Sequence, residues 1–421
     1  MRSSRSTRRP SSGQRDNMTM LNDSVVVSGL GPVSSIGIGR DAFRRGIEEG
    51  QVGTGPIQSF DATGFPYVNV GEVVNFDPCS ILAVLDRSDW GRSSLLAASA
   101  ARLAFEDAGS PAELNPERCS SVIGTTSGES QEIEALVAAW VNDPQAPMDS
   151  VDASRVAPSS LADAVNEELG FGGEAMTVST ACSASNYAVG YAYDLLKSGE
   201  ADAVIAGGAD SVCRWAHAGF YRLGAMTQDV CSPFDEHRSG ILTAEGGAAL
   251  FLERRSQAVA RGARIYATVR GYALSCDASH MVSPNREGIV RCMRLALENS
   301  GTCAEDVDYI CAHGTGTAAN DLTEGMAVKT VFGDSPPPIS SIKSMLGHSM
   351  GAASGFGAIA SVLALHEGFL PPTVNHGQTD HRLTGLDVVP NTSRSAHIEV
   401  AQNNGFAFGG NNAIVIFGKE A

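Results

Sequence analysis

The chain has 421 residues, 43% hydrophobic and 18% charged, which is enough apolar sequence to fold around a large core rather than remain disordered. Its 47 acidic and 30 basic side chains give a formal net charge of −17, which argues against nucleic acid or an anionic membrane as the main partner. It has no apolar run of membrane-spanning length, and its nine cysteines lack CxxC spacing. We therefore expect a cytoplasmic protein without a membrane span, a metal site or a disulfide framework.

The first 23 residues are rich in serine and arginine and are not followed by the apolar segment of a secretory signal. This composition predicts a disordered basic extension over residues 1–23.

Short apolar runs alternate with helical patterns through the first half of the chain. Residues 25–27 predict a buried strand that ends in a glycine turn at 28–32. Further strands are expected at 122–126, 175–180, 203–208 and 249–252, and helices from about 130 and over 183–197. Apolar strands alternating with helices indicate an α/β sheet covered on both faces.

The second half repeats this plan. Expected strands at 265–269, 307–313, 339–342 and 413–417 and a helix at 351–366 follow in the same order as their counterparts in the first half. The repeat predicts a duplicated α/β unit, with an N-terminal half at 24–262 and a C-terminal half at 263–421 fused into one body.

Cys182 is the strongest candidate for a catalytic residue. It lies where the strand at 175–180 meets the helix at 183–197, among small neighbours that leave room for a substrate. Unpaired backbone N–H groups at such a junction stabilise a thiolate, the form of cysteine that attacks carbonyl groups. The alternative is a buried structural cysteine.

Two histidines lie in glycine-rich surroundings. His313 ends a strand before Gly314-Thr315-Gly316-Thr317, and His348 is flanked by Gly347. An imidazole in such a position can donate an N–H into a cleft. Lys343 and Glu324 are candidates for charges that orient these groups, although each is also compatible with an ordinary ion pair.

A glycine-rich segment at 404–412 surrounds Phe406 and Phe408. It predicts either a close backbone approach to a ligand or a hairpin before the last strand. It has neither a GxGxxG pattern nor a Walker lysine, so nucleotide binding is not indicated.

Four motifs in this order resemble those of the β-ketoacyl-acyl-carrier-protein synthases, the type II ketosynthases of the condensing-enzyme class: VSTACSAS, AHGTGTAAND, SIKSMLGHSMGAAS and GFAFGGNNA. The segment SPFDEHRSGILTAEGGAA resembles the loop that this family has between its nucleophile and its first histidine. The resemblance spans about 25–417. It implies an α/β thiolase fold, a duplicated five-layered αβαβα body that works as a dimer.

The resemblance also implies an activity. Cys182 would take an acyl chain from a phosphopantetheine thioester on acyl carrier protein, with no bound cofactor. His313 and His348 would hold the carbonyl of malonyl-acyl-carrier protein, assist its decarboxylation and stabilise the enolate, which attacks the acyl-cysteine to give a 3-ketoacyl product.

Further residues take their roles from the same resemblance. The backbone N–H groups of Cys182 and Phe408 would form an oxyanion hole, and Phe408 matches a phenylalanine that acts as a gate. Thr315 and Thr317 match positions that contact the pantetheine arm.

The motifs depart from the common family pattern at several points. A glycine-rich segment of the GTGxGG kind is here GTTSGE at 124–129, and RDG, GEGA and SFGFGGTN become RSG, AEGG and GFAFGGNN. No departure removes a catalytic group. Together they favour a polyketide or polyene pathway over fatty-acid synthesis.

Related enzymes and subunits are the alternatives. A thiolase needs a second cysteine near the C-terminus, but the last cysteine is Cys311, and a type III synthase has asparagine where this chain has His348. The alternative of a different class is a non-catalytic subunit that resembles a chain-length factor, which usually lacks the nucleophile. The sequence leaves open whether the dimer is a homodimer or a heterodimer with such a subunit.

Overall fold

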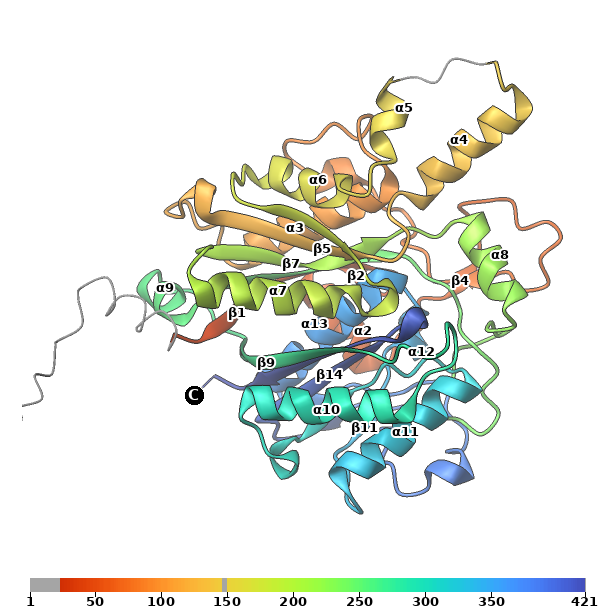
Figure 1. The fold of residues 1–421 in the computed structure, drawn as a ribbon, viewed down its shortest axis with the longest axis vertical. Helices are drawn as coiled ribbons and strands as arrows, with labels where there is room; N and C mark the ends of the chain where they lie inside the picture. The colour runs from red at the N-terminus through yellow and green to blue at the C-terminus, as the bar shows by residue number, and fades with distance from the viewer. Residues whose placement is uncertain (1–22, 146–149, 421) are drawn as a thin grey trace, which may run out of the picture.

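Two sets of five strands and three helical layers make up the body of the protein in a computed structural model, which describes residues 23–145 and 150–420. Figure 1 shows helices α3 and α6 above the first set of strands, α7 and α13 between the two sets, and α10 and α11 below the second. This is the αβαβα layering that the family resemblance implies.

The two sets of strands have the same topology. The first has the order β6-β5-β7-β8-β1, and the second has the order β11-β10-β14-β15-β9. In each set three parallel strands come first and the next two pairings are antiparallel. The sets join where three residues of β1, Val25–Val27, pair with β9. The strands are β1 (Val25–Ser34), β5 (Cys119–Thr125), β6 (Ala175–Ser179), β7 (Ala203–Asp210), β8 (Gly246–Arg254), β9 (Ala267–Cys276), β10 (Tyr309–Cys311), β11 (Ile339–Ser340), β14 (Val400–Phe406) and β15 (Asn411–Gly418).

The duplication predicted from sequence is confirmed by this topology, because corresponding strands follow one another in the same chain order in both sets. The inner helices also begin alike. Each follows a short 3₁₀ turn whose first residue is a non-glycine residue in the left-handed region. This residue is Ala181 at φ 54° before α7 and Met350 at φ 51° before α13. The layer helices are α3 (Arg92–Asp107), α6 (Ser160–Leu169), α7 (Ala184–Ser198), α10 (Arg286–Ser300), α11 (Ala318–Phe332) and α13 (Ala353–Glu367).

The remaining helices connect or flank these layers: α2 (Arg40–Glu49), α4 (Ser130–Asn142), α5 (Ser150–Arg155), α8 (Arg214–Arg222), α9 (Arg255–Ala260) and α12 (Lys343–Leu346). No helix in the described part of the chain is long and apolar enough to cross a bilayer. The predicted basic extension, except for Asp23, lies outside the described residues.

The predicted glycine turn at 28–32 is wrong. β1 continues through it to Ser34, and every residue of the strand is buried. The glycines are needed because α3 presses directly on the strand: a Cβ at Gly29 would lie 2.0 Å from the carbonyl oxygen of Ala104, and one at Gly31 would lie 1.8 Å from that of Ala100. The glycine pattern therefore marks a close helix–strand contact rather than a turn.

This contact predicts a large stability effect. Gly31→Ala should lower the free energy of unfolding by about 3 kcal/mol, because a main-chain carbonyl must move to admit the methyl group. Gly219→Ala is the matched control, since it lies within α8, where the added Cβ would meet no atom within 4 Å beyond the backbone of its own helix, and it should not lower the stability. Urea denaturation of both variants measures the difference, and equal stabilities would contradict this account of the contact.

Candidate functional site

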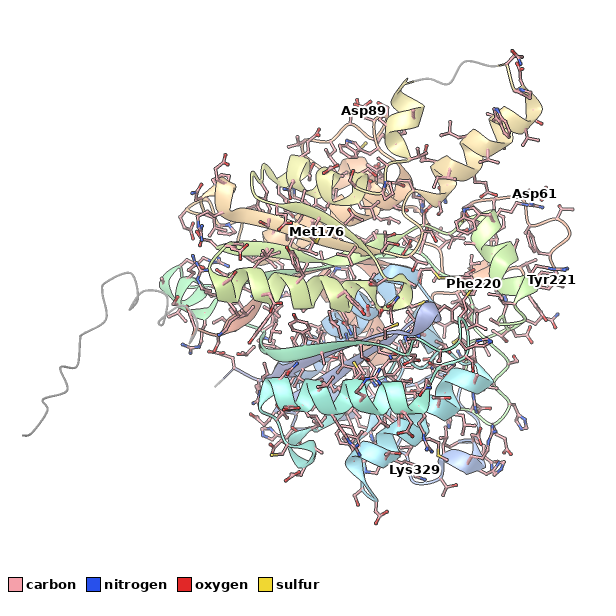
Figure 2. All side chains as sticks on the ribbon, viewed as in Figure 1. Asp61, Asp89, Met176, Phe220, Tyr221 and Lys329 are labelled. Atoms are coloured by element: carbon pink, nitrogen blue, oxygen red, sulfur yellow. The ribbon has the colours of Figure 1, made fainter. Side chains whose placement is uncertain are left out.

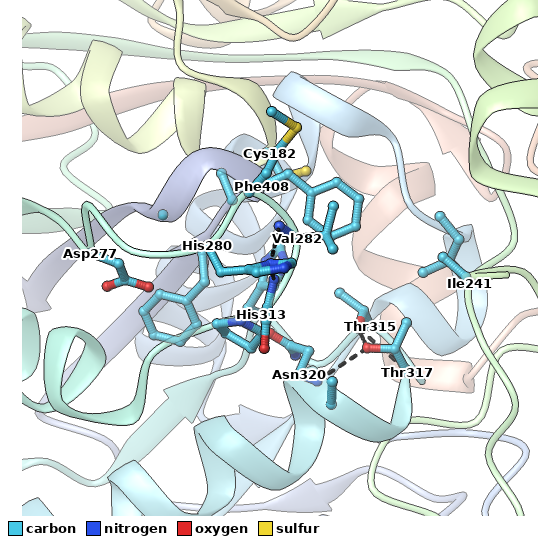
Figure 3. Close-up of a pocket in the computed structure, with 18 of the residues that line it drawn as sticks. Cys182, Ile241, Asp277, His280, Val282, His313, Thr315, Thr317, Asn320 and Phe408 are labelled. Carbon is cyan, nitrogen blue, oxygen red and sulfur yellow. Dashed lines mark hydrogen bonds between the residues drawn. The ribbon is translucent and has the colours of Figure 1, made fainter. Parts of the chain in front are cut away.

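One pocket collects side chains from both halves of the molecule (Figure 3). Its volume is about 60 Å³, room for a few water molecules. Six residues singled out from the sequence line it: Cys182, His313, His348, Thr315, Thr317 and Phe408. Lys343 and Glu324 do not line the pocket but are buried behind it.

Cys182 lies in the 3₁₀ turn Ala181–Ser183, which leads directly into α7. Burial raises the pKa of its thiol to about 11, and the nearby Asp210 carboxylate adds to this rise. The charge of Lys343 and the backbone N–H groups of Phe408 and Cys182 act in the opposite direction and lower the pKa. Burial raises the pKa of the thiol by more than the N–H groups lower it, so Cys182 is a thiol in the resting protein. The sequence-based expectation of a stabilised thiolate considered only the N–H groups.

His348 has a defined tautomer. Its Nδ1 accepts a hydrogen bond of 3.1 Å from the backbone N–H of Met350, so the ring proton is on Nε2. Burial and the charge of Lys343 keep the pKa of His348 well below its usual value. At neutral pH this imidazole is therefore an uncharged N–H donor on the wall of the pocket.

His313 lies beside His348, with ring centroids 5.5 Å apart and the rings nearly perpendicular at 81°. Burial, Lys343 and His348 hold its pKa well below the usual range, so it too is neutral. Its buried Nδ1 has no hydrogen-bond partner among the described residues. The two histidines thus form a pair of neutral imidazoles on the same pocket.

Lys343 and Glu324 fix the main chain at His313 rather than its ring. The Nζ of Lys343 donates to the carbonyl oxygen of His313 at 2.6 Å. The two carboxylate oxygens of Glu324 accept the backbone N–H groups of His313 and Gly314, each at 2.8 Å. These contacts explain why a lysine and a glutamate are buried here, and they place the imidazole through the backbone.

Lys343 also affects the nucleophile electrostatically. Lys343→Met should raise the pKa of the Cys182 thiol further, because a positive charge that favours the thiolate is removed. Alkylation of Cys182 by iodoacetamide at a fixed pH below the pKa should then be several-fold slower, as measured by peptide mass spectrometry over a pH series.

Lys329→Met is the matched control for this variant. Lys329 also donates to a main-chain carbonyl, that of Thr384 at 2.9 Å, but it lies on the outer helix α11, far from Phe220 on the pocket wall in Figure 2. Its replacement should leave the alkylation profile of Cys182 unchanged, and an equal change in both variants would contradict a specific effect of Lys343.

The turn that carries Thr315 and Thr317 is fixed by a buried carboxylate that the sequence reasoning missed. Asp321 accepts the backbone N–H groups of Thr315 at 2.9 Å and of Gly316 at 3.1 Å. The two threonine hydroxyls are 2.9 Å apart and both border the pocket. Asp321 ends the motif AHGTGTAAND and lies in the first turn of α11, so its place in this motif was the available signal.

Asp210 is a second carboxylate that the sequence reasoning missed. It ends β7 and accepts hydrogen bonds from the hydroxyl of Thr125 and from the backbone N–H groups of Thr126, Ser127 and Gly351. These bonds connect the turn after β5 to the 3₁₀ turn Met350–Ala352 that precedes α13, near enough to Cys182 for the carboxylate to affect its thiol. The glycine-rich strand end Gly207-Gly208-Ala209-Asp210 was its only trace in the sequence.

The segment at 404–412 forms the predicted hairpin, with β14 and β15 antiparallel. The turn Phe408–Gly410 contains Gly409 at φ 85° and Gly410 at φ 79°, both in the left-handed region. It holds the Phe408 N–H at the sulfur of Cys182 and the Phe408 ring on the pocket wall. Figure 3 shows Phe408 next to Cys182.

No group of three or more side chains that could hold a metal ion occurs within residues 23–145 and 150–420. The nine cysteines are all free. The reactive groups of the site are thus a thiol, two neutral imidazoles and backbone N–H donors around one small pocket.

Two family models match the chain. The model described as "Beta-ketoacyl synthase, N-terminal domain" matches residues 22–258, and the model described as "Beta-ketoacyl synthase, C-terminal domain" matches residues 266–376. A 3-oxoacyl-[acyl-carrier-protein] synthase 2 of Synechocystis sp. is 36% identical over 417 residues, covering 94% of this chain and 98% of that protein.

Solved structures agree with the sequence comparisons. The ishigamide ketosynthase/chain length factor is 48% identical with a TM-score of 0.93, covering 95% of this chain and 100% of that chain. A second similar structure is that of a type II polyketide synthase acyl-carrier protein in complex with its ketosynthase bound to the hexaketide. The identity is 29% and the TM-score 0.87, covering 94% of this chain and 100% of that chain. With the five layers described above, these similarities confirm the thiolase fold.

Proposed function

This chain belongs to the β-ketoacyl synthase family and is a ketosynthase, an acyltransferase of the condensing class; we propose that Cys182, His313 and His348 carry its reaction. The observation that supports this most is that a thiol, two neutral imidazoles and the Phe408 N–H meet on one pocket assembled from both halves of the chain. The substrates we propose are phosphopantetheine thioesters on acyl carrier protein.

The first half-reaction is acyl transfer to Cys182. As the thiol proton leaves, the sulfur attacks the thioester carbonyl, and the carbonyl electrons move onto oxygen. Collapse of this intermediate breaks the bond to the pantetheine sulfur, which takes up the proton released by Cys182 and leaves as a thiol. The N–H groups of Cys182 and Phe408 are the donors we assign to the oxyanion, and those donors already lower the pKa of the thiol in the free protein.

The second half-reaction needs donors to a different oxygen. Loss of CO₂ from the malonyl thioester leaves its bonding electron pair as an enolate, whose negative charge lies on the thioester oxygen. Two neutral N–H groups would stabilise this oxygen, one from His348 and one from His313. For His313 this requires the ring proton to be on the nitrogen that faces the pocket. The enolate carbon then attacks the acyl carbonyl, and the bond to Cys182 breaks to release the 3-ketoacyl product.

Neutral imidazoles suit this role. Burial and Lys343 keep the pKa values of both histidines well below the usual range, so neither ring is charged at neutral pH. A neutral donor stabilises the developing charge without first forming an ion pair with the malonyl carboxylate, which would oppose its loss.

Other assignments complete the proposal. Thr315 and Thr317 would contact the pantetheine arm, since both border the pocket, and Phe408 would act as the gate to it. Lys343 and Glu324 would position His313 through its main chain. The two halves would divide at 262/263, between the ranges that the two family models match.

The partners we propose are acyl carrier protein and a second ketosynthase-like subunit. The similar structures named above include a complex with an acyl-carrier protein and a ketosynthase/chain length factor. Because this chain has Cys182, we assign it to the catalytic side of such a pair, whether the second subunit is another copy or a chain-length factor. The similarity to the ketosynthase of a type II polyketide synthase, together with the motif departures given above, supports a polyketide or polyene pathway rather than fatty-acid synthesis.

Purified protein incubated with an acyl-carrier protein and malonyl-carrier protein tests this function. We expect a 3-ketoacyl-carrier protein extended by two carbons, with one CO₂ released for each product formed. Acyl exchange without a new carbon–carbon bond would contradict the proposed reaction.

A further inference from the structure

The buried carboxylate of Asp210 does not line the pocket, and no step of the proposed reaction uses it. Asp210 ends β7, the strand next to β5 in Figure 1. Its Oδ2 atom accepts the backbone N–H of Gly351 at 2.6 Å and that of Thr126 at 2.8 Å. Its Oδ1 atom accepts the hydroxyl of Thr125 at 2.8 Å and the N–H of Ser127 at 2.9 Å. These four bonds allow a carboxylate to be buried here, and they tie Gly351 to the end of β5.

Gly351 is held on both of its main-chain polar groups. Its N–H donates to Asp210, and its carbonyl oxygen accepts the hydroxyl of Ser185, from α7, at 2.6 Å. The space around it is full, because a Cβ at this position would lie 2.7 Å from the Oδ2 atom of Asp210 and 2.6 Å from the Cα atom of Thr125. The peptide that joins Met350 to Gly351 therefore has one fixed orientation.

The imidazole of His348 depends on the same turn. The main chain of His348 is held elsewhere, since its N–H donates to the carbonyl of Leu242 at 2.7 Å and its carbonyl accepts the N–H of Ala244 at 2.9 Å. The ring, in contrast, accepts the Met350 N–H on Nδ1 at 3.1 Å. This bond keeps the ring proton on Nε2, the nitrogen required for a donor on the pocket.

Met350 joins these two contacts. Its own N–H donates to His348, and the next N–H along the chain, that of Gly351, donates to Asp210. Met350 lies at φ 51°, a conformation that a non-glycine residue keeps only when the surrounding contacts hold it there. Without the acceptor at Asp210, the turn is free to relax and the Met350 N–H to rotate away from the imidazole.

We propose that Asp210 is a positioning residue that holds the His348 ring in its Nε2–H tautomer through the turn Met350–Ala352. Asp210 thereby sets the rate of the decarboxylation half-reaction and not that of acyl loading. This inference rests on the proposed function, because it assigns His348 to the enolate oxygen.

Asp210 has the opposite effect on the nucleophile, and this difference makes the proposal testable. Its carboxylate raises the pKa of the Cys182 thiol. Burial raises the pKa of Asp210 itself to about 6, so the carboxylate is ionised at pH 8. Removing the charge should therefore make the thiol more reactive at pH 8, whereas general damage to the site would lower both activities.

The test measures two rates on full-length Asp210→Ala at pH 8. Release of labelled CO₂ from malonyl-carrier protein should fall by about tenfold to 100-fold, because the ring of His348 remains but is no longer held as a donor. Alkylation of Cys182 by iodoacetamide should rise by about twofold to tenfold. Decarboxylation at the wild-type rate, or a fall in both rates, would overturn the proposal.

Asp210→Asn separates the hydrogen bonds from the charge. The amide keeps one oxygen that can accept the Gly351 N–H but has no charge. Alkylation of Cys182 should rise as in Asp210→Ala, while most of the lost decarboxylation rate should return. An equal loss of decarboxylation in both variants would contradict a role through this hydrogen bond.

Glu168→Ala is the matched control for the loss of a buried carboxylate. Glu168 is 1% exposed and accepts three backbone N–H groups at 2.8 to 3.0 Å, but it lies outside the pocket. Circular dichroism verifies that each variant is folded before it is compared. Both rates should match those of the wild-type protein, and a fall in decarboxylation like that of Asp210→Ala would overturn the specific effect.

A further measurement does not depend on the reaction. Solid-state NMR of protein labelled at the histidine ring nitrogens reports the tautomer of His348, whose signals are identified by their absence from His348→Gln. We expect the Nε2–H tautomer alone in the wild-type protein and a mixture of tautomers in Asp210→Ala. The Nε2–H tautomer alone in both would overturn the proposal. If the wild-type protein does not decarboxylate malonyl-carrier protein, the proposed function fails while this spectrum still tests the contact.

Discussion

Replacing Cys182 by alanine should abolish acyl loading and lower condensation by at least about 10⁴-fold. The reason is that the acyl chain must be held covalently between the two half-reactions, and no other thiol lines the pocket. Burial raises the pKa of this thiol to about 11, so its reactivity depends on the groups that favour the thiolate here, the charge of Lys343 and the N–H groups of Phe408 and of Cys182 itself.

The measurement is intact-protein mass spectrometry after incubation with an acyl-carrier protein. Cys119→Ala is the matched control, because Cys119 is also buried and burial likewise raises its pKa to about 12, but it opens β5 and does not border the pocket. The control should acylate like the wild-type protein. A full acyl adduct on Cys182→Ala would show that another residue is the nucleophile.

His313→Ala and His348→Ala should each lower the decarboxylation of malonyl-carrier protein by about 10²–10³-fold. Each variant removes one of two neutral donors to the enolate oxygen, and the loss of one such donor typically costs this much in rate. Because both pKa values lie well below the usual value for histidine, the wild-type rate should not fall as the pH decreases through 6.5.

Release of labelled CO₂ by the folded variants measures this effect. His376→Ala serves as the control, since His376 is also a buried histidine with a pKa lowered by burial, but it lies outside the pocket. The double variant should lose less than the product of the two single losses, because the two rings act on one oxygen. Wild-type rates in both single variants would contradict the two-histidine mechanism.

Local sequence patterns predicted the buried strands and inner helices well, because these are apolar runs of characteristic length, whereas the five layers were implied by the family resemblance. The motif order likewise brought Cys182, His313 and His348 forward as candidates, and the structure gathers them on one pocket. The sequence could not show which elements pack against one another. The glycines of β1 are needed for the contact with α3, which is far away in the chain, and without knowledge of that contact they were interpreted as a turn.

The same limit applies to the electrostatics of the site. The strand-to-helix junction correctly indicated N–H donors at Cys182, but the pKa of the thiol is dominated by burial, which depends on the whole fold. Phe220 and Asp210 contact the site only through tertiary packing, so no local pattern distinguished them from ordinary helix and strand residues.

The most direct test of the ketosynthase account is to locate the acyl group. Wild-type protein would be incubated with an acyl-carrier protein, quenched at low pH to preserve thioesters, digested and mapped by tandem mass spectrometry across all nine cysteines. We expect the acyl mass on Cys182 alone. When malonyl-carrier protein is added, this acyl mass should disappear from Cys182 and 3-ketoacyl-carrier protein should form. An acyl group on a different cysteine, or one on Cys182 that malonyl-carrier protein does not consume, would contradict it.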